Sequence, residues 1–435
     1  GVKFTQGYVS GPYCSPTRAG LVTGRYQTRF GHEVNPPPTP TAGLPVDQKT
    51  IADRLKAAGY KTSVIGKWHL GMKPSDNPLG HGFDEFFGVM DTDHPYFGEM
   101  AGNPILRGRT PVPASGYLTD TLATEAVSFI RRRAGEKFFL YVPFTAAHSP
   151  LQAKPEVLAR LSYIANEKRR LFAGVLVSLD EAVGKITAAL RTAGVTDNTI
   201  VVFTTDNGAE VFTWPDGGMT PFRATKGTVF EGGFRVPAII RWPGKVKPGT
   251  VQNGIFSGLD WLPTLAAAAG SPDITDQLLK GVKLGDRTYK NHLDGYDQTD
   301  LLLGTGPSKR HELFYFGGAK LGALRYDDFK FQFYQQPWGW PGEKVTTDMP
   351  TIVNLRQDPF ERTPSIRGES LNDMGGGYMN DFYAREFWRF VLVQQAVAAL
   401  AKTAIDYPPM QAPASFNLEA VKAQIDEVIG NKNGQ

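Results

Sequence analysis

Apolar segments of strand length alternate with helical segments through about the first 270 of the 435 residues. We expect one strand over Thr62–Ile65 and further strands in KFFLYVPF, NTIVVFTT and RVPAIIRW. Helices are expected over about residues 51–58, 117–133 and 167–193, where apolar side chains recur at helical spacing. Such alternation is typical of a mostly parallel sheet with helices on both faces. The sequence therefore predicts an α/β fold.

Polar residues follow several of these predicted strands directly. They are Lys67, His69, His148, Asp206 and Asn207. Because ligands of parallel sheets bind beyond the carboxyl ends of the strands, we expect these side chains to share one site. The last two carry oxygen donors of the kind that calcium and magnesium prefer, and Gly208 allows the chain to turn so that both can face one ion. A DNG triplet by itself is more typical of a simple turn than of a metal site.

The stretch GPYCSPTRAGLVTGRY, residues 11–26, holds the only cysteine of the chain, Cys14. Its prolines suit a loop that enters a helix, which we expect from about Pro16 to Gly24. Cys14 and Arg18 are four residues apart, so they would lie near one face, beside the N–H groups and partial positive charge of the helix N-terminus. The pattern indicates an anion site with a reactive residue, although a lone cysteine is more often a small buried apolar side chain.

The texture of the sequence changes from about residue 310. The aromatic runs ELFYF, GALRYDD, KFQFYQQ and TIVNL are spaced like the strands of a small antiparallel sheet, and helices are expected over about 381–405 and 418–429. We therefore expect a catalytic domain over residues 1–309 and a smaller C-terminal α+β subdomain over 310–435. The segment from about 72 to 113, rich in Gly, Pro and Asp, is expected to be irregular, like the rims of many active sites.

Composition limits the classes of function. A hydrophobic content of 41%, a charged content of 21% and a net charge of +4 are typical of a globular protein and give little reason to expect nucleic-acid binding, which we set aside. No uninterrupted apolar run approaches the roughly 18 residues of a membrane helix, so no membrane partner is expected. A single cysteine cannot form an internal disulfide, which fits a cytosolic or bacterial periplasmic protein better than an animal secreted one.

Motifs spread over nearly the whole chain resemble those of the type I sulfatase family, in the expected order. They are C-x-P-x-R at 14–18 followed by LVTGR, GKWHLG at 66–71, AAHSP around His148, TTDNG at 204–208, KGTVFEGGFRVP at 226–237 and NLRQDPFER at 354–362. The resemblance implies an alkaline-phosphatase-like sandwich with a smaller C-terminal sheet. It also implies hydrolysis of aryl or carbohydrate sulfate monoesters, with a sulfated small molecule or glycan as the substrate.

By the same resemblance, a formylglycine-generating enzyme oxidises Cys14 to formylglycine, and the hydrate of this aldehyde supplies the nucleophilic hydroxyl. After one oxygen of the hydrate takes the sulfuryl group, the other can collapse to the aldehyde and expel sulfate, an exit that serine lacks. Arg18 and Lys67 would hold the hydrate and balance charge near a metal ion. His69 would polarise or deprotonate the second hydroxyl.

The resemblance assigns two residues to the sulfate and the leaving oxygen. Lys226 and His148 would bind the sulfate and protonate that oxygen, and the division of labour between them stays open, since lysine can act as an acid at neutral pH only with a lowered pKa. His94, in DTDHPYF, lies where substrate-contacting residues are expected. Trp338 and Trp340 would suit stacking on a sugar or an aromatic ring, although tryptophans pack in cores as often.

The implied metal ion is calcium or magnesium, with Asp206, Asn207 and the Cys14-derived oxygen as ligands. These are too few for the roughly six to eight oxygens that calcium takes. The family pattern adds an aspartate pair on a first strand, so we expect that strand in a segment that precedes Gly1. A signal peptide would lie there as well and cannot be observed in this chain; the expected location is the bacterial periplasm or the outside of the cell.

Two other functions remain open at this level. A phosphonate monoester or phosphodiester hydrolase of the same superfamily can use the same formylglycine and would turn over phosphodiesters faster than sulfates. A non-catalytic binding protein on this fold would keep an unmodified Cys14.

Overall fold

The computed structural model describes residues 1–35, 43–210, 218, 220–284, 287–336, 339–362, 382 and 384–408. The helix expected over 418–429 and Trp338 lie outside these residues. No helix in the described part of the chain combines the length and the apolar character that crossing a membrane requires.

The first sheet has five strands in the order β6-β5-β4-β3-β7. These are β3 (Lys61–Lys67), β4 (Glu85–Val89), β5 (Leu106–Arg107), β6 (Thr110–Pro111) and β7 (Phe138–Tyr141). Strand β3 pairs in parallel with β4 and β7, as the sequence predicts, whereas β5 and β6 are antiparallel additions at one edge. The expectation of an irregular segment up to residue 113 is wrong for β4, which is a buried strand of this sheet.

The second sheet has four strands in the order β10-β1-β9-β8. These are β1 (Val2–Phe4), β8 (Val201–Thr204), β9 (Ala238–Arg241) and β10 (Thr250–Gln252). β1 pairs in parallel with β10, whereas β9 runs antiparallel to both β1 and β8. A short parallel pair, β2 (Gly7–Tyr8) with β11 (Phe256–Ser257), continues from this region. The strands expected in NTIVVFTT and RVPAIIRW are therefore confirmed, although β9 does not share the direction of its neighbours.

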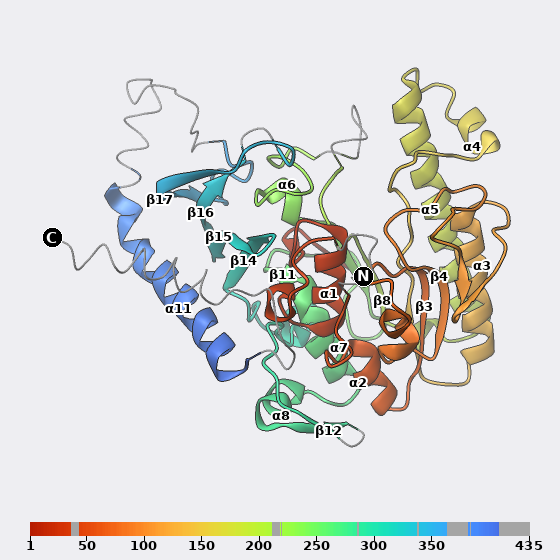
Figure 1. The fold of residues 1–435 in the computed structure, drawn as a ribbon, viewed down its shortest axis with the longest axis horizontal. Helices are drawn as coiled ribbons and strands as arrows, with labels where there is room; N and C mark the ends of the chain where they lie inside the picture. Colours follow the sequence, from red (N-terminus) through yellow and green to blue (C-terminus); the bar gives the residue numbers. More distant parts are fainter. Residues whose placement is uncertain are drawn as a thin grey trace.

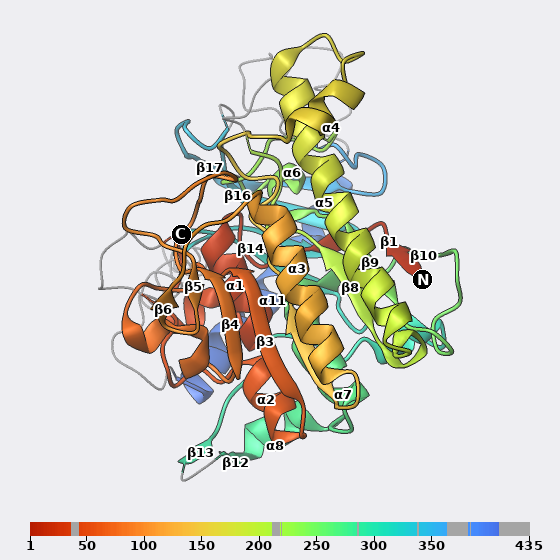
Figure 2. The ribbon, with the colours of Figure 1, turned by 90° about the vertical axis from the view of Figure 1, so that its right-hand side faces the viewer.

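Helices cover both faces of the five-stranded sheet. Successive strand residues point to opposite faces, and Val64 packs with residues of α1 (Cys14–Thr23) and α2 (Ile51–Ala57), while Ile65 packs with α3 (Leu118–Arg133). Figure 2 shows α3 beside the long helix α5 (Glu167–Thr192), and the two are in contact. This two-sided cover confirms the α/β class.

Shorter helices and strands connect the elements of the two sheets described above. The helices are α4 (Pro155–Arg160), α6 (Glu231–Phe234), α7 (Trp261–Ala268), α8 (Ile274–Lys280) and α9 (Thr299–Leu303), and β12 (Val282–Leu284) pairs with β13 (Arg287–Tyr289). Short 3₁₀ turns lie at Gln27–Phe30, Pro74–Asp76, Pro78–Gly80, Thr196–Asn198, Gly258–Asp260 and Phe387–Arg389.

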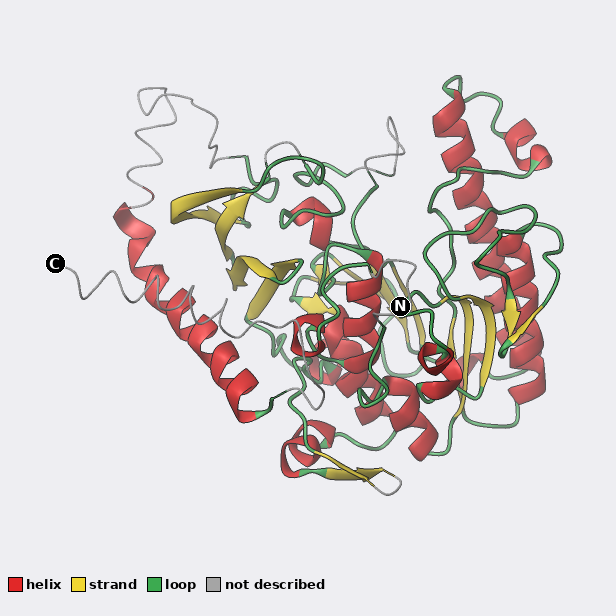
Figure 3. Ribbon diagram, in the orientation of Figure 1, coloured by secondary structure: helices red, strands yellow, loops and turns green. Residues whose placement is uncertain are grey.

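The C-terminal part forms the antiparallel sheet that the aromatic runs predict. Its strands follow chain order, β14 (Glu312–Gly317), β15 (Lys320–Tyr326), β16 (Phe329–Gln335) and β17 (Val345–Asn354). Helix α11 (Phe390–Asp406) lies along this sheet and packs Val393 and Leu400 against Phe331 and Ile352 (Figure 3). In Figure 1, α1 lies at the centre of the molecule, with the C-terminal sheet on one side and the five-stranded sheet on the other.

Candidate active site

The site begins at the N-terminus of α1. Cys14 is the first residue of this helix, so the helix starts slightly earlier than the sequence predicts, and Gly24 ends it in the left-handed conformation. The thiol is only 2% exposed. Arg18, Lys67 and Lys226 all lie close enough to Cys14 to interact with it electrostatically. Burial alone would fit a structural cysteine, but a ring of cations around it fits an anion site.

Arg18 connects α1 to the ends of two strands. Its Nη1 donates to the backbone oxygen of Lys67 at 2.7 Å, and its Nε and Nη2 donate to Oδ2 of Asp206 at 3.0 and 2.8 Å. Burial raises the pKa of Asp206, but the charges of Arg18, Lys67 and Lys226 and the hydrogen bonds from Arg18 outweigh it and lower the pKa to about 2. Asp206 is therefore a carboxylate throughout the neutral range.

Lys67 and His69 leave the end of β3 together. The Lys67 N–H donates to Pro143 O at 2.8 Å, and the His69 N–H donates to Met90 O at 2.9 Å. His69 has a φ of 57°, in the left-handed region that residues other than glycine rarely adopt. Burial lowers the pKa of Lys67 and, reinforced by nearby cations, holds the pKa of His69 well below its usual value. His69 is thus a neutral imidazole that can accept a proton.

Lys226 and His148 enter from two loops. Burial lowers the pKa of Lys226, but the charges of Cys14 and Glu210 and a 2.6 Å ion pair with Glu210 raise it overall. Burial and the Lys67 charge lower the pKa of His148, whose Nδ1 lies 2.8 Å from the backbone oxygen of Ser149. Lys226 is therefore a cation at neutral pH, whereas the lowered pKa favours the neutral form of His148.

His94 lies on a neighbouring segment. It is buried, and its Nδ1 lies 2.8 Å from the backbone oxygen of Pro95. The Tyr96 hydroxyl donates to the backbone oxygen of His148 at 3.0 Å, which joins the two loops. The structure thus places His94 on the segment that contacts the His148 loop, two residues before Tyr96.

Asp206 and Asn207 fit a hard cation chemically, but only as part of a larger set. The Asn207 Nδ2 donates to Gly208 O at 2.8 Å, while its buried Oδ1 has no hydrogen-bond partner among the described residues. An unpaired buried carbonyl oxygen beside an ionised carboxylate is suited to a calcium or magnesium ligand. The described residues contain no group of three or more His, Cys, Asp or Glu side chains placed to hold a metal ion. The pair therefore supplies two oxygens and not a complete site.

Sequence reasoning missed several residues of this site. Glu210 is the ion-pair partner of Lys226, and its position two residues after the DNG turn was the available signal. Ser15, next to the cysteine, places its Oγ 2.6 Å from Nε2 of His32 and 2.5 Å from the backbone oxygen of His69. No local sequence pattern predicts a role for His32, because its contact with Ser15 joins residues 17 positions apart.

The buried histidine behind Ser15 predicts a pH effect on stability. Burial lowers the pKa of His32 from 6.5 to about 4, so the folded chain binds fewer protons than the unfolded chain between these values. The resulting stability is present above the unfolded pKa and is lost as the pH falls toward 4. We expect His32 alone to reduce the free energy of unfolding by about 2 kcal/mol between about pH 7.5 and pH 5.

His32→Gln keeps a hydrogen-bonding side chain but cannot titrate. Its thermal midpoint, measured by calorimetry at both pH values, should fall less on acidification than that of the wild type. An equal fall in both proteins would show that His32 is not among the titrating groups.

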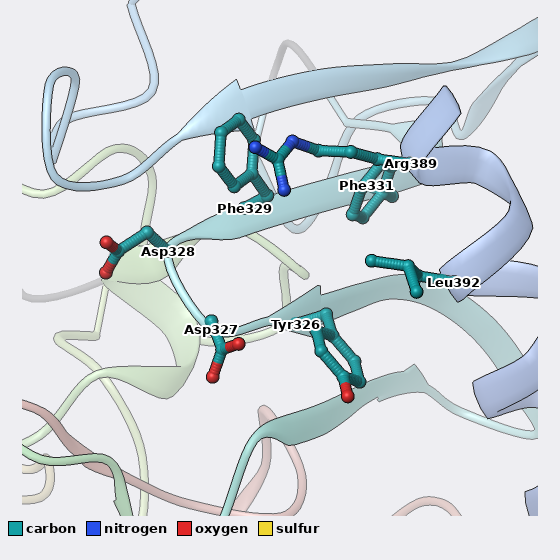
Figure 4. Close-up of a pocket in the computed structure, with 7 residues that line it drawn as sticks. All are labelled: Tyr326, Asp327, Asp328, Phe329, Phe331, Arg389 and Leu392. Carbon is teal, nitrogen blue, oxygen red and sulfur yellow. The ribbon is translucent and has the colours of Figure 1, made fainter. Parts of the chain in front are cut away.

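A separate pocket lies between the β15–β16 turn and α11 (Figure 4). It is lined by Tyr326, Asp327, Asp328, Phe329, Phe331, Arg389 and Leu392. The Arg389 guanidinium lies 3.7 Å from the ring centre of Phe329. None of the predicted site residues lines this pocket, and its carboxylates do not favour a sulfate, so we assign it no part in the site around Cys14.

Trp340, one of the two tryptophans suited to stacking on a substrate ring, packs beside residues of the Cys14 site. Trp340 follows β16 of the C-terminal sheet, and its ring packs edge-on against Tyr13, the residue before Cys14, at 5.6 Å between ring centres. The Lys226 Nζ lies 5.7 Å from the centre of the same ring. Trp340 also packs on the backbone of Gly227, where a Cβ would fall 2.2 Å from the indole. The C-terminal sheet thus contributes one wall of the site.

Together, an α/β sheet with a cationic cluster beyond its strand ends and a lone cysteine at the centre defines an enzyme that acts on anionic esters. A sequence model of the Sulfatase family matches residues 1–271. The N-acetylgalactosamine-6-sulfatase of Canis lupus familiaris is 32% identical over 410 residues, which cover 84% of this chain and 74% of the relative. Arylsulfatase A of Bos taurus is 35% identical over 413 residues, which cover 83% and 75%. The chain belongs to the type I sulfatase family, and it is an enzyme that hydrolyses sulfate esters.

Solved structures agree with this assignment. Ps i-CgsB, solved in complex with k-i-k-neocarrahexaose, has a TM-score of 0.76 and 27% identity, with 99% of this chain and 90% of that chain covered. The sulfatase PsFucS1 from Pseudoalteromonas sp. has a TM-score of 0.76 and 25% identity, with 94% and 84% covered. The phosphonate monoester hydrolase SpPMH from Silicibacter pomeroyi shares the fold at a TM-score of 0.55 and 18% identity, with 90% and 88% covered. The alkaline-phosphatase-like fold is confirmed, and the two alternative functions are not favoured.

Proposed function

We propose that this sulfatase cleaves carbohydrate or aryl sulfate monoesters with a formylglycine derived from Cys14 as its nucleophile. The observation that carries the proposal is the position of Cys14, the first residue of α1, among Arg18, Lys67 and Lys226. A sulfate ester is an anion, so its oxygens need cations, and fixed charges in a buried site act more strongly than in water. This arrangement supports an attack on sulfur at the Cys14 position.

The conversion of Cys14 supplies an aldehyde whose hydrate offers two oxygens, one to take the sulfuryl group and one to expel it. The other groups act through charge and hydrogen bonding. Lys67 and Lys226 hold the sulfate oxygens, and neutral His69 accepts a proton from the nucleophile position. Arg18 is committed to Asp206 and to the Lys67 backbone, so it fixes the geometry of both.

Asp206 and Asn207 would hold a divalent cation, for which we propose calcium. Such an ion would supply positive charge beside the sulfate oxygens and the nucleophile. The unpaired Asn207 Oδ1 and the low pKa of Asp206 support this assignment. The oxygen derived from Cys14 would be a further ligand, and these three are still fewer than the roughly six to eight oxygens that calcium takes.

We assign the protonation of the leaving oxygen to His148. The ion pair with Glu210 keeps Lys226 positively charged and suits it to hold the sulfate, whereas the pKa of His148 can rise toward neutrality when an anionic substrate binds next to it. General acid catalysis matters most for poor leaving groups. We expect His148→Ala to lower kcat about 100-fold or more for a sugar sulfate, but much less for 4-nitrophenyl sulfate.

The matched variant for this comparison is Lys226→Met, which should lower kcat/KM for both esters to a similar degree. Should His148→Ala slow both esters equally while Lys226→Met discriminates between them, the two roles would have to be exchanged.

Trp340 supports a ring-bearing substrate. We propose that the sugar or aryl ring of the ester packs against Trp340 and Tyr13, which flank Lys226 and Cys14. Trp340→Ala should raise KM about three- to tenfold, Trp340→Phe should raise it less, and inorganic sulfate should inhibit all three proteins alike. Weaker inhibition by sulfate in Trp340→Ala would mean instead that the indole only supports Lys226.

The similar proteins also support a carbohydrate or aryl sulfate as the substrate. Ps i-CgsB was solved in complex with k-i-k-neocarrahexaose, and the curated relatives are an N-acetylgalactosamine-6-sulfatase and an arylsulfatase A. A panel of sulfated glycans and aryl sulfates, with released sulfate as the readout, tests the proposal. Faster turnover of a paired phosphodiester or phosphonate ester would reverse the proposal.

Two further expectations remain predictions. They are the location in the bacterial periplasm or outside the cell, and the maturation by a formylglycine-generating enzyme.

A further inference from the structure

Three charged side chains are completely buried between α6 and the C-terminal sheet. They are Glu231, Lys330 and Glu361, each with 0% exposure. The Lys330 Nζ lies 3.1 Å from Oε1 of Glu231 and 2.8 Å from Oε1 of Glu361. We call this group the buried triad.

Every carboxylate oxygen of the buried triad has a partner. Glu231 accepts from the Tyr8 hydroxyl at 2.5 Å and from the Tyr315 hydroxyl at 2.8 Å. Glu361 accepts from Gln332 Nε2 at 2.7 Å and from the Glu231 backbone N–H at 2.6 Å. Removal of charges from water is unfavourable, so a buried ion group of this kind is weak evidence for stability alone. Its function is better explained by the segments that it holds in place.

The triad is connected to the catalytic loops through backbone hydrogen bonds. Glu361 binds the first residue of α6 through its side chain, and its backbone oxygen accepts from Arg223 Nη1 at 2.7 Å. The Gly208 N–H of the DNG turn then donates to Gly233 O in α6 at 3.1 Å. The contact is so close that a Cβ on Gly208 would fall 1.7 Å from Gly232 O.

The loop before α6 belongs to the same framework. The Lys226 N–H donates to Ala209 O, and the Gly227 N–H donates to Pro12 O, each at 2.9 Å. The segments that carry Cys14, Asp206 and Lys226 are therefore bonded to one another, and α6 attaches them to the C-terminal sheet.

We propose that Glu361 and Lys330 are positioning residues. They fix the positions of the catalytic loops that carry Asp206 and Lys226 relative to the C-terminal sheet. This inference rests on the proposed role of those two residues in the sulfate site. It gives the NLRQDPFER motif, which contains Glu361, a physical function. Small displacements of groups around a reacting centre lower rates strongly, so the effect should be on affinity for sulfate and on kcat, beyond any loss of stability.

The test compares Glu361→Gln and Lys330→Met with a matched control. Asp260 and Arg310 form another buried pair, with Nη2 to Oδ1 at 2.5 Å and side-chain exposures of 0% and 1%, but they join the 3₁₀ turn before α7 to the segment before β14 and do not involve α6. Thermal midpoint, kcat/KM on a sulfate ester and the inhibition constant of inorganic sulfate are measured for each protein, well below its midpoint.

Glu361→Gln and Lys330→Met should lower kcat/KM about tenfold or more and weaken inhibition by sulfate about fivefold or more. Asp260→Asn should lower the thermal midpoint without weakening inhibition by sulfate. Since Lys330→Met leaves two carboxylates facing each other, the double variant Lys330→Met/Glu361→Gln should recover part of the lost affinity.

Equal losses of sulfate affinity in Asp260→Asn and Glu361→Gln, at matched losses of midpoint, would overturn the inference. If Glu361→Gln does not fold, Glu361→Asp takes its place, because it keeps the charge and shortens the side chain. Glu361→Asp should lower kcat/KM and sulfate affinity in the same direction but by smaller factors. An unchanged sulfate affinity in Glu361→Asp would also overturn the inference. A wild-type protein that releases sulfate from no ester would instead refute the proposed function, so the two failures are distinguishable.

Discussion

Replacement of Cys14 by alanine is expected to lower sulfate ester hydrolysis by about 10⁴-fold or more, because it removes the group that becomes the nucleophile. The substitution is mild for the fold. The thiol is small and 2% exposed, and alanine suits a helical first turn. Released sulfate from an aryl sulfate measures the effect, with a thermal midpoint close to that of the wild type as evidence of folding.

Cys14→Ser tests the proposed release of sulfate more specifically than Cys14→Ala. A serine hydroxyl could take one sulfuryl group from the substrate, but it has no second oxygen on the same carbon to expel sulfate. We expect a single stoichiometric sulfation without turnover, visible as the added mass of one SO₃ group on the peptide of residues 11–18. Turnover by the alanine variant at near the wild-type rate would contradict a role for Cys14 in the reaction.

Asp206→Asn is expected to lower kcat/KM by about 100- to 1,000-fold, because the amide keeps the size but removes the charge that Arg18 and the proposed cation share. The carboxylate is ionised throughout the neutral range, since the surrounding cations lower its pKa to about 2. Treatment with a chelator should inactivate the wild type, and added calcium should restore it. The variant should gain nothing from calcium.

The control for this change is a second buried arginine–aspartate pair. Arg29 Nη2 and Asp294 Oδ1 lie 2.5 Å apart, with side chains 3% and 5% exposed, in a part of the chain that the proposed chemistry does not use. Asp294→Asn should lower stability and keep the calcium response. If the chelator leaves the wild type fully active, the proposed metal role of Asp206 and Asn207 is wrong, while the ion pair with Arg18 stands.

Much of this architecture could be predicted because its signals are local. The helix after Cys14 follows from prolines and a closing glycine within a dozen residues, and the C-terminal sheet follows from four aromatic runs with turn residues between them. The predicted site residues converge because most of them follow strands whose carboxyl ends meet at one edge of the fold.

The features that sequence reasoning missed depend on distant partners. β4 lies in a segment rich in Gly, Pro and Asp, which favoured an irregular structure, yet Gly88 is required there because it faces Gly66 of β3 and a Cβ would fall 1.9 Å from the Gly66 carbonyl oxygen. The antiparallel direction of β9 is set by pairing with β1, more than 230 residues earlier in the chain. The buried triad likewise joins residues 99 and 130 positions apart.

The most direct test of the central claim is a mass spectrum of the peptide containing residues 11–18, taken from enzyme that is releasing sulfate. Conversion of Cys14 to formylglycine predicts loss of the sulfur and a decrease of about 18 Da relative to the encoded peptide. It also predicts that the aldehyde reacts with a hydrazide probe. An intact thiol at Cys14 in fully active enzyme would contradict the proposed nucleophile, while the fold and the family of the chain would stand.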